Sequence, residues 1–161
     1  MKNRKVIDVI LLANPGYLAL IELSLLVGTG ILGWVFSWPK LPLFPALNVT
    51  GGALFLGAIA FHLYCERTHQ QAHDQADDIT HIVTTGVYSK IRHPLYLSLI
   101  FMNLGIGLAF GVTCTLIIAI ATGVLAIMTA FREEKFLLEE FPEEYGQYKK
   151  DVRWRLIPKI F

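Results

Sequence analysis

The stretch that decides the fold is PLYLSLIFMNLGIGLAFGVTCTLIIAIATGVLAIMTAF, residues 94–131, which contains no charged side chain. A helix rises about 1.5 Å per residue, so this stretch has about 57 Å of helix. That length is enough for two crossings of a hydrocarbon core about 30 Å thick. Because Gly111 divides it, we predict a helical hairpin whose membrane-spanning helices cover 94–110 and 112–131.

Two further apolar stretches precede the hairpin. Residues 17–36 contain one charged side chain, Glu22, and residues 47–65 contain none. Each stretch has about the 17–25 residues that a transmembrane helix needs. The sequence therefore predicts an all-α integral membrane bundle of four transmembrane helices, forming a single domain over residues 1–161.

The two ends of the chain are more polar. Residues 1–15 carry Asp8 and close with Asn14-Pro15, a pair that ends a helix, so we expect an interfacial helix there. Residues 132–161 hold many charges and predict a cytoplasmic helical tail.

Positive charges predict the orientation. With four spans, thirteen of the fourteen Lys and Arg residues fall on one side of the membrane, and only Lys40 falls on the other. The side rich in Lys and Arg is normally cytoplasmic. We therefore expect a multi-pass protein with both termini in the cytoplasm.

The composition excludes several other classes. Apolar residues make up 54% of the chain and charged residues 17%, whereas a soluble domain has about a quarter charged residues. A net charge of +1 argues against a nucleic-acid partner. Cys65 and Cys114 fall near opposite ends of the predicted spans, so we expect no disulfide between them.

One pattern resembles a metal site. His69 and His73 are four residues apart, with Asp77 beyond, and would share a face of a helix. No matching third set of ligands occurs elsewhere, so we favour a solvated helix extension and expect no metal.

Two polar segments flank the hairpin and carry a recognisable pattern. The order is Gly86-x-Tyr88-x-x-x-Arg92-His93-Pro94-x-Tyr96, the hairpin, Glu133-Glu134, and then Phe141-x-x-x-Tyr145-x-x-Tyr148. Over residues 80–158 this order resembles the isoprenylcysteine carboxyl methyltransferase family, which is similar to the phospholipid N-methyltransferases. The resemblance implies an intramembrane enzyme that moves a methyl group from S-adenosylmethionine to a lipidic or prenylated substrate.

The resemblance also implies a cofactor site. The ammonium of S-adenosylmethionine needs carboxylates, and Glu133 and Glu134 lie where the fourth span ends. Its carboxylate needs a cation, and Arg92 or His93 lies where the third span begins, beside a helix N-terminus whose N–H groups favour anions. Antiparallel spans bring the two groups together. The expected cofactor-binding residues are Tyr88, Arg92, His93, Pro94, Tyr96, Glu133 and Glu134.

Methyl transfer to a carboxylate needs alignment and a dry site rather than a base. Arg155 or Arg153 could steer the substrate carboxylate, and Arg155 in Arg-Leu-Ile-Pro fits the family's closing pattern better. We expect the catalytic residues to be Arg155, Glu134 and Tyr145.

Simpler interpretations remain open at this point. Arg92-His93-Pro94 could be a basic flank with a helix start, the Glu pair a solvated helix exit, and Tyr88 and Tyr96 interfacial anchors. Glu22, inside the first span, could be functional, but protonation or a hydrogen bond to a neighbouring helix is favoured.

Three other functions also remain open. N-methylation of an aminolipid would need a base, for which His93, Glu134 or Glu22 is a candidate. A catalytically silent membrane protein of the same fold is the second. A membrane reductase that uses a nicotinamide cofactor is the third, although no glycine-rich dinucleotide motif occurs.

Overall fold

The computed structural model describes residues 15–43, 45–68 and 81–161. This part of the chain is helical, and its only β-type pairing is one isolated bridge between Lys40 and Val112. The all-α class is therefore confirmed. The elements are α2 (Pro15–Val35), α3 (Ala46–Thr68), η2 (Gly86–Ser89), α4 (Pro94–Phe110), α5 (Thr113–Glu140) and α6 (Pro142–Asp151).

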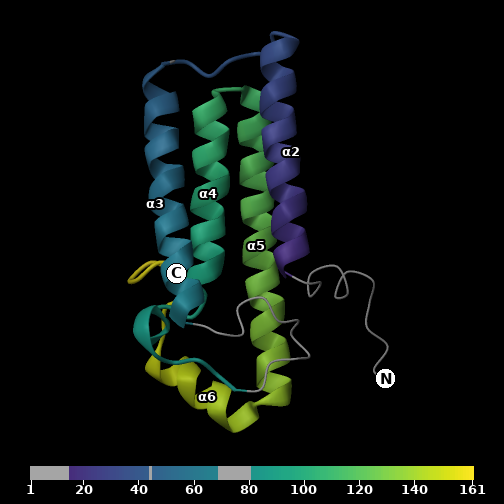
Figure 1. Ribbon diagram of the computed structural model, residues 1–161. Coiled ribbons are helices and arrows are strands. Elements are labelled where there is room, and N and C mark those ends of the chain that lie inside the picture. The colour runs from purple at the N-terminus through teal and green to yellow at the C-terminus, as the bar shows by residue number, and fades with distance from the viewer. Residues whose placement is uncertain (1–14, 44, 69–80) are drawn as a thin grey trace, which may run out of the picture.

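Four of these helices lie side by side, and α6 crosses one end of them (Figure 1). Helix α4 is central, because it packs against α3, α5 and α2. Helices α2, α3 and α5 are long and apolar enough to cross a membrane, whereas α4 is apolar but has only 17 residues. An integral membrane bundle is thus supported directly by three helices.

The hairpin of α4 and α5 turns within two residues. Gly111 caps α4 with a φ of 64°, in the left-handed region that favours glycine, and its N–H donates to the Leu108 carbonyl at 3.0 Å. The loop after α2 closes over this turn, where Leu41 N–H donates to the Gly111 carbonyl at 2.8 Å. The two helices therefore form a hairpin with its boundary at Gly111, and α4 has the predicted bounds, whereas the following helix covers Thr113–Glu140 rather than 112–131.

Glycines let α3 and α4 approach closely. A Cβ added at Gly105 would lie 2.7 Å from the backbone nitrogen of Phe55, and one at Gly51 would meet the backbone of Ala109. Small residues in spans commonly serve such packing. The sequence alone does not tell which glycines serve this packing. An added Cβ at Gly52 or Gly57, for example, would have no atom within 4 Å.

Helix α5 runs nine residues past Phe131, where its predicted span ends. This extension carries Glu133 and Glu134 on rigid helix rather than on a loop. Two predictions fall outside the described residues, namely the interfacial helix at 1–15, apart from Pro15, and the helical extension at His69 and His73.

Candidate active site

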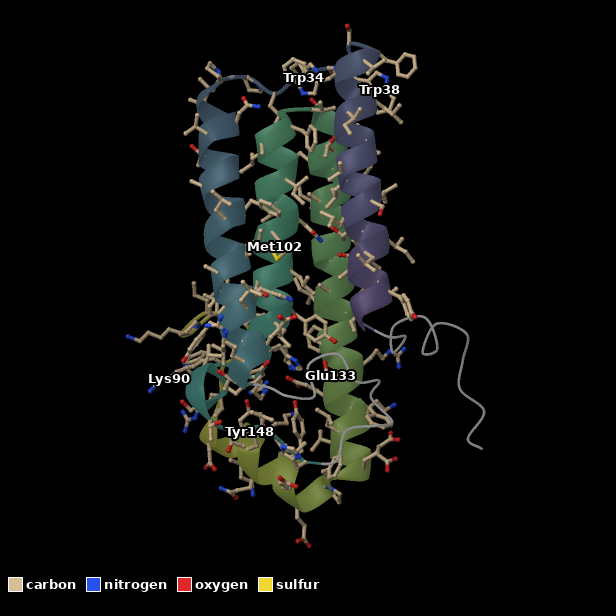
Figure 2. The ribbon with its side chains drawn as sticks, viewed as in Figure 1. Trp34, Trp38, Lys90, Met102, Glu133 and Tyr148 are labelled. Atoms are coloured by element: carbon tan, nitrogen blue, oxygen red, sulfur yellow. The ribbon has the colours of Figure 1, made fainter. Side chains whose placement is uncertain are left out.

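A buried carboxylate, Glu134, lies at the centre of the polar end of the bundle. Only 4% of Glu134 is exposed, and its Oε1 atom lies 2.9 Å from Arg92 Nη2, 3.2 Å from His93 Nε2 and 2.9 Å from Arg155 Nε. Figure 2 shows the neighbouring Glu133 and Tyr148 at this end of the bundle, and Trp34 and Trp38 at the other. The expected meeting of 92–93 with 133–134 is therefore observed.

Arg92 connects Glu134 to the C-terminal segment. Its Nε donates to Glu134 Oε1 at 3.0 Å, while its Nη1 donates to the carbonyls of Val152 at 2.6 Å and Arg153 at 2.8 Å. The guanidinium has hydrogen-bond acceptors on two sides, and only 8% of the residue Arg92 is exposed. Arg92 is thus fixed in place.

The backbone at the start of α4 also binds the C-terminal segment. The N–H groups of Arg92 and His93 donate to the carbonyls of Trp154 and Arg155, each at 2.9 Å. We expected N–H groups beside the helix start to face an anion, and for these two that expectation is wrong, because the returning segment occupies them. Pro94 begins α4 in its first turn, as predicted.

Arg155 completes the set around Glu134. Its Nε and Nη2 donate to Glu134 Oε1 and Oε2 at 2.9 and 3.0 Å, which is the two-point pairing that only arginine provides. Its guanidinium carbon lies 4.1 Å from the centre of the Phe131 ring and 5.1 Å from that of Phe161. Two aromatic rings therefore flank the guanidinium that holds the carboxylate.

His93 stands between the two carboxylates. Its Nε2 faces Glu134, its Nδ1 lies 3.7 Å from Glu133 Oε2, and its ring centre is 5.6 Å from that of Tyr96. Glu133 Oε2 is buried, and no described residue donates a hydrogen bond to it. A buried carboxylate oxygen of this kind is able to accept a hydrogen bond from a bound cation.

Three tyrosines line the same end. Tyr148 donates its hydroxyl hydrogen to the Tyr88 carbonyl at 2.7 Å, while the Tyr145 hydroxyl is buried with no partner among the described residues. Burial raises the pKa of Tyr145, and the charges of Glu134 and Glu133 raise it further. Tyr145 therefore keeps its proton at neutral pH and can serve as a hydrogen-bond donor.

Glu134 is ionised despite its burial. It lies one turn past Phe131, beyond the predicted span. Burial on its own would raise the pKa of Glu134, but hydrogen bonds from His93 and Arg155 and the charge of Arg92 hold it far below the usual range. The same hydrogen bond raises the pKa of Arg155. The cluster therefore keeps an ionised carboxylate paired with guanidinium groups at neutral pH.

One partner of Glu134 was not predicted. Lys149 Nζ lies 3.6 Å from Glu134 Oε2, and its side chain is 33% exposed. The sequence did contain an indication of this contact. Lys149 follows Tyr145 by four residues, so the two side chains share a face of α6.

A second polar network lies deeper in the bundle. Asn103 Nδ2 donates to Glu22 Oε2 at 2.9 Å and to Thr122 Oγ1 at 3.0 Å. These residues come from α4, α2 and α5, so the network joins three helices. The favoured interpretation of Glu22, a hydrogen bond to a neighbouring helix, is confirmed, whereas Asn103 was missed.

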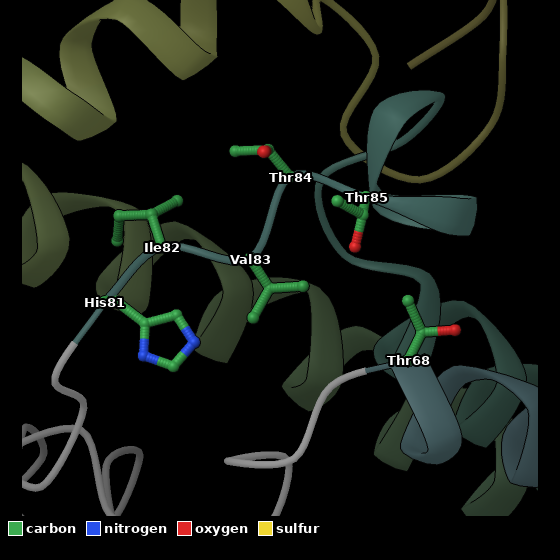
Figure 3. A pocket seen from close by; sticks show the side chains of 6 residues that line it. All are labelled: Thr68, His81, Ile82, Val83, Thr84 and Thr85. Carbon is green, nitrogen blue, oxygen red and sulfur yellow. The ribbon is translucent and has the colours of Figure 1, made fainter.

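A pocket of about 240 Å³ opens beside the end of α3 (Figure 3). Its lining residues are Thr68, His81, Ile82, Val83, Thr84 and Thr85. None of the predicted site residues lines it, so the pocket and the cluster around Glu134 are different places.

The fold and the cluster define a class: a helical membrane protein whose ionised groups are buried together at one end. The family model for phospholipid methyltransferases matches residues 47–144. The protein-S-isoprenylcysteine O-methyltransferase of Homo sapiens is 31% identical over 126 residues, covering 71% of this chain. The mouse protein of the same name is 30% identical over 129 residues.

The chain belongs to the phospholipid methyltransferase family. Its resemblance to the isoprenylcysteine methyltransferases is confirmed by the two relatives. The chain spans 43% of the length of each of these relatives.

Proposed function

We propose that this protein is an integral membrane methyltransferase that moves a methyl group from S-adenosylmethionine to the carboxylate of a lipidic, isoprenylcysteine-like acceptor. One observation carries the proposal: Arg155 holds a carboxylate through two hydrogen bonds at the end of an apolar bundle. The same fork would hold an acceptor carboxylate. The relatives are named for O-methylation of isoprenylcysteine, which fits that chemistry.

In this proposal the site lies at a membrane surface. In the proposal, α2, α3, α4 and α5 all cross the bilayer, because the short α4 runs beside the long helices on either side of it. The charge distribution supports an orientation with both termini and the Glu134 cluster on the cytoplasmic face. An amphiphile in the cytoplasmic leaflet could present its polar head there while its tail stays in lipid.

The residues present fit S-adenosylmethionine, which supplies an electrophilic methyl on a sulfonium when bound. Glu133 Oε2 is buried without a donor, so we assign it the direct hydrogen bond to the cofactor's ammonium. The Tyr145 hydroxyl is the second buried polar atom available. Arg92 and His93 would contribute through their side chains, because their backbone N–H groups bind the C-terminal segment. Tyr88, Pro94, Tyr96 and Glu134 would shape the same site.

The chain's own residues then align the acceptor. A carboxylate nucleophile needs no proton removed, so orientation and exclusion of water supply the acceleration. Arg155 would fix the plane of the carboxylate, because its fork is rigid and Phe131 packs on its face. Arg92, tied to two carbonyls, keeps the returning segment and hence Arg155 in place.

N-methylation of an aminolipid is the second candidate, favoured by the family match. That reaction needs a base near the methyl group. His93 lies between Glu133 and Glu134 and is the best placed of the candidates. A fixed guanidinium beside the acceptor would repel an ammonium, so the position of Arg155 favours the carboxylate.

The test is binding and turnover on the full chain purified in detergent. Calorimetric titration with S-adenosylmethionine should show binding, and titration with NADPH should not. Methyl transfer from labelled S-adenosylmethionine to an N-acetyl-S-prenylcysteine should exceed transfer to phosphatidylethanolamine vesicles. Transfer to the aminolipid alone would overturn the carboxylate assignment and support the second candidate.

A further inference from the structure

The two arginines on Glu134 are held very differently. Arg92 binds Glu134 and, through Nη1, two backbone carbonyls, and 6% of its side chain is exposed. Among the described residues, every side-chain hydrogen bond of Arg155 goes to Glu134, and 18% of its side chain is exposed. Arg155 is therefore the arginine that can leave Glu134 without breaking other hydrogen bonds.

The surroundings of Arg155 allow such a movement. The guanidinium lies over the face of Phe131 and near Phe161. The centres of the two rings are 5.9 Å apart, and Phe131 is 45% exposed and Phe161 38% exposed. A cation over an aromatic face is attracted without a fixed direction in the plane of the ring. The guanidinium can thus turn over these rings while it keeps their contact.

If Arg155 moved away from Glu134, one carboxylate oxygen would lose its main hydrogen-bond donor. Oε1 would still have Arg92 and His93, but Oε2 is paired with only two described groups, Arg155 Nη2 at 3.0 Å and Lys149 Nζ at 3.6 Å. A buried carboxylate oxygen without a partner is strongly unfavourable. Lys149 is the remaining cation at Oε2. Its side chain is flexible and partly exposed, so its Nζ can move from 3.6 Å to hydrogen-bond distance of Oε2.

We propose that Glu134 occupies, in the resting protein, the place of the acceptor's carboxylate on Arg155, and that Lys149 is a positioning residue that pairs with Glu134 Oε2 when Arg155 turns to the acceptor. This inference rests on the proposed function, since it concerns the same fork. Two carboxylates compete for Arg155, one internal and one on the acceptor.

The exchange also distinguishes acceptor from product. A methyl ester has no ionised oxygen to compete for a two-point pair with arginine. Once the carboxylate is esterified, Glu134 regains Arg155 and the product loses its charged contact. The internal pair therefore favours release of the ester over release of the acid.

The experiment measures binding, and so does not depend on turnover. An N-acetyl-S-prenylcysteine and its carboxamide are titrated into the full chain as wild type, Lys149→Met, Lys149→Arg and Lys150→Met. Lys150 is the matched control, because it is the exposed neighbour on α6. Lys149→Met should bind the acid about tenfold more weakly, equal to about 1.4 kcal/mol. Its affinities for the carboxamide and for S-adenosylmethionine should stay as in wild type.

Lys149→Arg should restore the affinity for the acid, and Lys150→Met should leave it unchanged. An equal loss for acid and carboxamide in Lys149→Met, or no loss at all, would overturn the inference. The proposed function fails separately. An acid that binds and depends on Lys149, but receives no methyl group from S-adenosylmethionine, contradicts the function and leaves the exchange standing.

Discussion

Arg155 and Glu134, 21 positions apart in the chain, form a two-point ion pair whose hydrogen bonds measure 2.9 and 3.0 Å. The pair joins the C-terminal segment to the extension of α5 that leaves the predicted span. It brings together a residue expected to serve the acceptor and one expected beside the cofactor. In the proposed function, the acceptor and cofactor positions would be coupled through this one carboxylate.

Replacement of Arg155 by lysine should impair use of the acceptor carboxylate while leaving cofactor binding intact. Lysine keeps the charge but cannot form the two-point pair, so methyl transfer to a carboxylate should fall about 10- to 100-fold, or about 1.4–2.8 kcal/mol. The dissociation constant for S-adenosylmethionine should change little. Turnover and calorimetry on one preparation check both. A variant that no longer binds the cofactor, or that methylates carboxylates as before, would contradict the assignment of Arg155 to the acceptor.

Replacement of Glu133 by glutamine should weaken cofactor binding without unfolding the protein. The change removes the charge from a buried carboxylate oxygen to which no described residue donates a hydrogen bond. Loss of a hydrogen bond to a charged group costs about 1.5–3 kcal/mol, so the dissociation constant should rise by about 10- to 150-fold. Glu140→Gln, at an exposed site on the same helix, is the control. Equal affinities in both variants would show that Glu133 does not contact the ammonium.

Replacement of Glu134 by alanine should destabilise the fold. It leaves Arg92 buried beside His93 with no carboxylate, and removing one member of a buried pair costs about 3–5 kcal/mol. Thermal unfolding in detergent measures the loss. A midpoint equal to that of the Glu140→Gln control would mean that the cluster contributes little to stability.

Acidification should remove the stabilisation of the fold that ionised Glu134 provides. The pKa of Glu134 is lowered in the folded protein, so its stabilisation is complete above the unfolded value of about 4.3 and is lost as pH falls further toward the folded value. Unfolding midpoints of the wild type should be flat from about pH 7 to 5 and then drop. Glu134→Gln should drop less steeply below about pH 4.3. Parallel curves would argue against an ionised Glu134.

The topology predicts opposite labelling of two lysine positions. Lys40 and Lys150 are both exposed. Lys40 belongs to the loop between α2 and α3 and Lys150 to α6, and these two segments lie at opposite ends of the bundle (Figure 1). In sealed right-side-out vesicles, a membrane-impermeant maleimide should label Lys40→Cys from outside and Lys150→Cys only after permeabilisation. A Cys114→Ser background removes the exposed native thiol. Labelling of both cysteines from the same side would exclude four spans.

The sequence by itself determined the four apolar helices and both ends of α4, whereas α5 continues past its predicted end. Uninterrupted apolar residues require helix in lipid, Gly111 supplies the turn, and Pro94 starts the helix that follows Arg92-His93. Antiparallel packing then brings residues about forty apart to one end, which is why the Arg-His-Pro and Glu-Glu segments were correctly placed together. The motif spacing also identified the family.

Only the tertiary structure decided which contacts each member of a group makes. Glu133 and Glu134 are neighbours on a helix and point about 100° apart, so packing alone determines that Glu134 receives two arginines while Glu133 keeps an oxygen without a donor. The fork of Arg155 and the approach of Lys149 depend on how the C-terminal segment and α6 return to α4. Such contacts join residues far apart in the chain, and no local pattern encodes their distance or orientation.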